Sequence, residues 1–96
     1  MKLVQKAQEV RSNEPELLDT LGWVYYKMGN THRAAEIISQ AQSSDPTNAI
    51  LNYHLGVVLA EIDRKEEALG HLQDAVNSGQ NFNGIDKARE LLKSLQ

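Results

Sequence analysis

Three side chains in this sequence are of the types that nucleophilic catalysis requires. Thr20 has a hydroxyl, His54 has an imidazole that can act as a base, and Asp19 has a carboxylate that can orient that imidazole. Acyl transfer also needs donors for an oxyanion, and no glycine-rich loop or catalytic motif accompanies these residues. Because helical surface residues often meet by chance, we predict a non-enzymatic protein with no catalytic residue.

The sequence also argues against sites for metals, phosphates and nucleic acids. The chain has no cysteine, and His32 and His71 are too scattered to form a metal-binding pattern. Residues 77–84 are rich in Asn and Gly but contain no phosphate-loop motif. A net charge of −3 has the wrong sign for a nucleic-acid surface, and no apolar run is long enough to insert into a membrane. We therefore predict no metal, no cofactor, no nucleic-acid partner and no insertion of this segment into a membrane.

An internal repeat of 34 residues determines which elements position these side chains. Twelve Leu and nine Ala, against two Pro, favour helix throughout. A shift by one period superposes identical small and apolar residues: Leu17 on Leu51, Leu21 on Leu55, Gly22 on Gly56, Val24 on Val58, Ala34 on Ala68, Ala41 on Ala75 and Ser44 on Ser78. Ala7 extends the same register one period earlier. The repeat predicts hairpins of two helices stacked side by side.

Apolar spacing within each period is helical and occurs twice, as expected for a hairpin. It predicts six helices, over about 2–11, 15–28, 31–43, 49–61, 65–77 and 84–95. The second of these is expected to bury one face, formed by Leu17, Leu18, Leu21, Val24, Tyr25 and Met28. Asn83 with Asp86 resembles a capping box at the start of the last helix.

Small residues are expected where the two helices of a hairpin cross. Gly22 with Ala34 occupies this place in one unit, and Gly56 with Ala68 in the next. A larger side chain there would force the helices apart and cost about 1–3 kcal/mol. A turn residue with positive φ is expected at Gly29 and at its counterpart Asp63, because Asp tolerates that conformation better than most residues.

These residues resemble the tetratricopeptide repeat. The stretch 18–46 carries Leu21-Gly22, Tyr25, Gly29, Ala34, Ala41 and Pro46, and 51–75 carries Leu55-Gly56, Ala68 and Ala75. The resemblance implies an all-α, right-handed solenoid of antiparallel hairpins in a single domain, 1–96. Its parts are the second helix of a truncated repeat (1–14), two full repeats (15–48 and 49–82) and a capping helix (83–96). More narrowly, residues 18–29 resemble the last repeats of long bacterial arrays.

The resemblance also implies where a partner would bind. In this family the first helices line a concave groove, which here would be formed by Glu16, Asp19, Thr20, Trp23, Tyr26, Lys27, Ile50, Tyr53, His54, Val57, Ala60 and Glu61. Trp and Tyr commonly anchor interfaces, although Trp23 and Tyr26 could equally pack between adjacent first helices. One variant of the groove grips a terminal carboxylate with Lys, Asn and Arg. The matching positions here hold none of these: Asp19, Trp23, His54, Gly84 and Ala88.

We therefore predict an interaction module that binds a peptide or helix of a partner protein in its groove. The alternative is a terminal structural segment of a longer scaffold that has no ligand of its own. The helix predicted at the N-terminus has an apolar stripe, Leu3, Val4, Ala7 and Val10, that one neighbouring helix covers only in part. Because exposed apolar patches favour association, a homo-oligomer formed through this helix is a further expectation.

Overall fold

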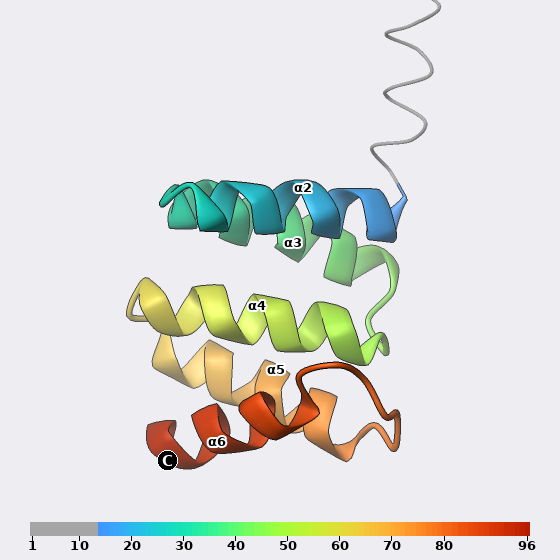
Figure 1. Cartoon of the computed structure of the whole chain (residues 1–96), viewed down its shortest axis with the longest axis vertical. Helices are drawn as coiled ribbons and strands as arrows, with labels where there is room; N and C mark the ends of the chain where they lie inside the picture. The colour runs from blue at the N-terminus through green and yellow to red at the C-terminus, as the bar shows by residue number, and fades with distance from the viewer. Residues whose placement is uncertain (1–13) are drawn as a thin grey trace, which may run out of the picture.

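The computed structural model describes residues 14–96, and this part of the chain forms five helices (Figure 1). They are α2 (Pro15–Lys27), α3 (Thr31–Ser44), α4 (Ala49–Glu61), α5 (Lys65–Asn77) and α6 (Ile85–Leu95). All five were predicted from the sequence to within a residue at either end, whereas the helix predicted over 2–11 lies outside the described residues. None of the described helices is long and apolar enough to cross a membrane.

The helices form two layers. α2, α4 and α6 lie side by side in one layer, with α3 and α5 behind them (Figure 1). α2 pairs with α3 and α4 with α5 as antiparallel hairpins, while α3 also packs on α4 and α5 on α6. This confirms the all-α fold of stacked hairpins that the repeat predicted.

Each hairpin crosses at a glycine, as expected. A Cβ added at Gly56 would lie 2.6 Å from Leu72 Cγ and 3.4 Å from the Ala68 carbonyl oxygen. At Gly22 the atom would collide with Ile38 and lie 3.3 Å from the Ala34 carbonyl oxygen. The helices therefore approach so closely that only a residue without a side chain fits.

The second helix of one repeat forms much of the core for the next. Ile38 of α3 is fully buried in one cluster with Leu55 and Val58 of α4. In a neighbouring cluster, Ala41 packs with Leu51. Burial of such side chains contributes about 1.5–3 kcal/mol each, so the stacking of hairpins is a main source of stability.

The buried face predicted for α2 is wrong in part. Leu18 is buried, but Leu17, Leu21 and Val24 are 41%, 45% and 49% exposed, and Met28 is 72% exposed. The repeat made them look buried because their counterparts on α4 are covered by α3. In the described part of the chain, α2 has no such helix on that side.

The turns confirm one expectation and correct another. Gly29 and Asp63 both have positive φ, 90° and 66°, at equivalent turns. At the start of α6, however, the N-cap is Gly84, with φ of 106° and no side-chain cap, so the Asn83–Asp86 capping box does not form. The box fails because the chain turns through Gly84, which separates Asn83 from the helix.

Asn52 of α4 is the centre of a buried polar junction. Asn52 is 1% exposed, and its Nδ2 donates to the Pro46 carbonyl oxygen at 3.0 Å. Its Oδ1 accepts from Gln42 Nε2 at 3.3 Å and from His71 Nδ1 at 2.9 Å. One amide thus connects α3, the turn after it, α4 and α5, and its buried polar atoms are all satisfied.

The close approach at Gly56 can be tested by adding a side chain. We expect Gly56→Leu to lower the free energy of unfolding by about 1–3 kcal/mol, because the added side chain would collide with Leu72, which is fully buried. Gly70→Leu is the matched control, because no neighbouring atom lies within 4 Å of its Cβ position. The higher helix propensity of Leu should raise the free energy of unfolding of this variant by about 0.5–1 kcal/mol. Thermal unfolding followed by circular dichroism measures both, and equal effects would contradict the packing.

The His71 junction predicts a pH-dependent stability. Burial lowers the pKa of His71, although Asp74 and Glu67 nearby act in the opposite direction. The unfolded chain, whose histidine has a pKa of about 6.5, then binds a proton more readily than the folded one. Stability is therefore lost as the pH falls from about 6.5 through the lowered pKa of the folded state. Denaturant unfolding between pH 5 and pH 8 measures this effect. The free energy of unfolding should fall less at low pH in His71→Gln than in the wild-type chain. The exposed His32→Gln is the control, and a matching pH profile for both variants would refute the prediction.

Candidate functional site

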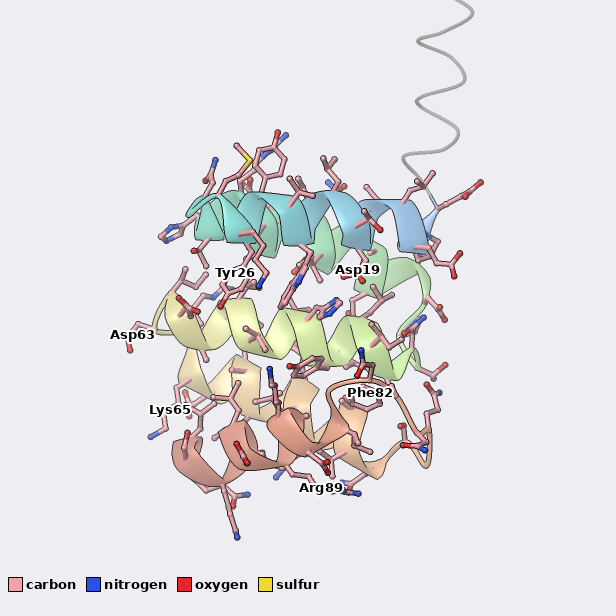
Figure 2. All side chains as sticks on the ribbon, viewed as in Figure 1. Asp19, Tyr26, Asp63, Lys65, Phe82 and Arg89 are labelled. Atoms are coloured by element: carbon pink, nitrogen blue, oxygen red, sulfur yellow. The ribbon has the colours of Figure 1, made fainter. Side chains whose placement is uncertain are left out.

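The residues predicted to bind a partner come from α2 and α4. Many of them meet along the line where these two helices lie side by side, which we call the seam. We call this surface the first-helix face and define it by the predicted residues Glu16, Asp19, Thr20, Trp23, Tyr26, Lys27, Ile50, Tyr53, His54, Val57, Ala60 and Glu61. Figure 2 shows Asp19 and Tyr26 directed into the space between the two helices. Three sets of contacts cross the seam or flank it, and they determine what the face can do.

The central contact joins Asp19 to His54. His54 Nδ1 lies 2.8 Å and 2.9 Å from the two carboxylate oxygens of Asp19. The two side chains are only 18% (His54) and 14% (Asp19) exposed, so the pair is largely shielded from water. Because the carboxylate can only accept, His54 Nδ1 donates to it. The pair fixes the orientation of the imidazole.

Thr20 does not complete a catalytic set with this pair. Its hydroxyl donates instead to the Glu16 carbonyl oxygen of its own helix, at 3.0 Å. Such back-bonding is common for hydroxyl side chains within helices. Asp19 and His54 therefore meet as the sequence suggested, but their contact joins two helices and does not activate the Thr20 hydroxyl.

Trp23 is at the centre of the aromatic part of the face. Its ring stacks on His54, with centroids 4.0 Å apart and planes at 24°, and lies 4.8 Å from the ring of Tyr26. The ammonium of Lys27 lies 5.8 Å from the centroid of the same ring, within the range of a cation–π contact. Trp23 is half-buried, so its contacts within the face leave part of the side chain exposed.

A second cross-helix bond closes the other end of the seam. The Tyr26 hydroxyl donates to Glu61 Oε2, joining the C-terminal turns of α2 and α4. This hydrogen bond, together with burial and the negative charge of Glu61, raises the pKa of Tyr26 to about 12. The phenol therefore remains protonated, and a donor, at all physiological pH values.

Tyr53 was predicted as a groove residue, but the structure buries it. It is 9% exposed and packs against Phe82, with ring centroids 5.7 Å apart. A Cβ at Gly84 would lie 2.7 Å from Tyr53 Cε2, so the loop before α6 presses directly on this ring. Burial also raises the pKa of the Tyr53 hydroxyl. Tyr53 thus belongs to the core between α4 and α6, and it offers a partner little surface.

The loop over Tyr53 is the feature that sequence reasoning missed. Gln80 Oε1 accepts from the Ala49 backbone N–H at 3.1 Å, and its Nε2 donates to the Thr47 carbonyl oxygen at 3.1 Å. These bonds attach residues 78–84 to the start of α4, while Phe82, 8% exposed, inserts into the core. An aromatic residue in an otherwise polar loop was the available signal.

Two hollows lie beside α4. One, of about 260 Å³, lies where α2 and α4 begin and is lined by Glu16, Asp19, Thr20, Asn48, Ile50 and Leu51. The other, of about 360 Å³, lies between α4 and α6 and is lined by Tyr53, Asn83, Gly84, Ile85, Asp86 and Lys87. Val57 packs instead against the core on the α6 side, and Ala60 against the core shared with α3. The face can thus bind through hydrogen bonds, aromatic contact and negative charge.

Comparison with known proteins agrees with this architecture. A family model described as "Anaphase-promoting complex, cyclosome, subunit 3" matches residues 1–75. No curated protein matched the chain. The match supports the tetratricopeptide type of repeat but not the narrower likeness to bacterial arrays. Domains of this type are typically non-catalytic and generally serve as protein–protein interaction modules. With more than half of its length matched and its hairpins stacked as described, the chain belongs to this family of tetratricopeptide-like helical-repeat domains.

Proposed function

We propose that the first-helix face binds a peptide or helix of a protein partner, with Trp23 as the anchor. The observation that carries the proposal is a half-buried tryptophan whose ring is fixed by its stack on His54 and its contact with Tyr26. His54 and Tyr26 hold its ring, so binding would cost little conformational entropy. Interface energy is commonly concentrated in such aromatic residues.

The charge of the face favours a basic segment of the partner. Glu16 is exposed at the first hollow, and the carboxylate of Asp19 lies beside it. The five positions that hold a terminal carboxylate in one variant of the family here carry Asp, Trp, His, Gly and Ala. An anionic chain end would be repelled, whereas a Lys or Arg side chain would find an opposite charge.

A binding experiment can separate the anchor from its surroundings. Peptides selected from a random displayed library on the wild-type chain should be rich in basic residues, and fluorescence anisotropy gives their Kd. Trp23→Ala should weaken binding by about 30-fold, as expected for an anchor worth about 2 kcal/mol. Glu16→Lys should weaken it by about tenfold, because it reverses the charge at the hollow.

Glu36→Lys is the control for the charge reversal, since Glu36 is exposed on α3, behind the face. It should leave the Kd unchanged. Each variant is first shown to retain its helical circular dichroism and cooperative unfolding. Full retention of binding by both Trp23→Ala and Glu16→Lys would refute the groove assignment.

The same contacts support a second candidate, in which this region only stabilises a longer scaffold. The ring of Trp23 stacks on that of His54, and α6 covers the core around Leu72 and Ala75. Under this alternative, deletion of 83–96 lowers the melting temperature and solubility but leaves peptide binding as weak as for an unrelated protein. Selection of peptides whose affinity depends on Trp23 would exclude it.

A further inference from the structure

The hollow between α4 and α6 is lined by backbone donors that the described part of the chain leaves without an acceptor. It has a volume of about 360 Å³ and lies at the start of α6, where the N-cap Gly84 provides no side-chain cap. Within residues 14–96, the backbone N–H groups of Asp86 and Lys87 in the first turn have no acceptor. Such groups form the positive end of the helix dipole and favour a negatively charged ligand.

The Tyr53 hydroxyl is a second, independent donor in the same hollow. Tyr53 is only 9% exposed, and within residues 14–96 its hydroxyl has no hydrogen-bond partner. Every fully buried side-chain oxygen of the described residues has a partner, so this unpartnered oxygen lies where the hollow is open. It is next to the start of α6, because a Cβ at Gly84 would be 3.3 Å from it. Burial raises the pKa of the hydroxyl, which therefore remains a donor at neutral pH.

The charged side chains of the hollow indicate which anion it suits. Lys87 is exposed and supplies one positive charge. Asp86 lines the same hollow, but its carboxylate is 89% exposed, and its Oδ1 lies 3.4 Å from Arg89 Nη1. One lysine beside one aspartate leaves little net charge, so a singly charged carboxylate is repelled less than a doubly charged phosphate.

We propose that this hollow binds a carboxylate through the Tyr53 hydroxyl and the N–H groups of Asp86 and Lys87, with the Lys87 ammonium as the opposite charge. These three residues are not among the five positions that hold a terminal carboxylate in one variant of the family. The site stands apart from the proposed function, because its donors are present whether or not the first-helix face binds a partner.

The occupant is an Asp or Glu side chain of the segment that binds the first-helix face, and this part of the proposal rests on the proposed function. Ile50 lines the acidic hollow between α2 and α4, and Tyr53 lines the present one. The two residues are one helical turn apart on α4. One segment that crosses α4 would thus place a basic residue near Glu16 and an acidic residue near Tyr53.

Sodium acetate tests the site without a partner. In ¹H–¹⁵N spectra, the amides of Asp86 and Lys87 should shift saturably with acetate, measured against sodium chloride at equal ionic strength. Tyr53→Phe removes only an unpartnered hydroxyl, so it should weaken acetate binding about tenfold without lowering the melting temperature. Tyr25→Phe is the matched control and should bind acetate as the wild type does, because Tyr25 lies on α2 and does not line the hollow.

A second pair of variants tests the positive charge. Lys87→Gln should weaken acetate binding about threefold, as expected for an exposed ion pair. Lys93→Gln, in the last turn of α6, is the control and should have no effect. Shifts that do not saturate, or that are the same in Tyr53→Phe as in the wild type, would overturn the site. Tighter binding of inorganic phosphate than of acetate would overturn the choice of a carboxylate.

Peptides selected on the wild-type chain test the occupant. When they are synthesised with amidated C-termini, only Asp and Glu supply carboxylates, and Tyr53→Phe should weaken their binding about tenfold. If Tyr53→Phe weakens the binding of acetate but not of these peptides, an acidic side chain of the partner is not the occupant. Failure of the proposed function would look different: Trp23→Ala would retain peptide binding, while the response to acetate would be unchanged.

Discussion

The close contact of two helices at a residue without a side chain is the constraint on which the rest of this structure depends. At Gly22 and Gly56 the partner helix lies so near that even a Cβ would meet Ile38 or Leu72. Helices this close bury their facing side chains completely, as at Ala34, Ala68 and Leu72, all 0% exposed. Each hairpin is thus well packed inside but keeps apolar residues on its outer sides. It is stable only when a neighbouring hairpin covers these residues.

The stacking of the hairpins also creates the candidate site. When α3 covers one side of α4, it brings α2 and α4 side by side. Residues about one period apart in sequence then become neighbours. Asp19 and His54, 35 positions apart in sequence, meet for this reason, as do Tyr26 and Glu61. The polar seam between first helices therefore follows from the apolar packing behind it. This explains why the carboxylate and imidazole can be adjacent with no catalytic role.

Sequence periodicity predicted the helices and their pairing because both depend on local spacing and on small residues at crossings. It also indicated that Asp19 could approach His54, since residues about one period apart lie on neighbouring first helices. It failed for side chains whose exposure depends on elements outside their own hairpin. The exposure of Leu17 and Leu21 depends on whether a neighbour is present, and the burial of Tyr53 depends on a loop with no counterpart in the first repeat. Periodicity carries no information about either.

The central claim is that the hairpins stack through α3, which packs against both α2 and α4. Nuclear Overhauser effects between methyl groups test it most directly in a sample with labelled Ile, Leu and Val. The account predicts cross-peaks from the Ile38 methyls to those of Leu55 and Val58, which share one buried cluster. If Ile38 shows no cross-peak to either residue while the contacts within each hairpin persist, the hairpins do not stack and the account is contradicted.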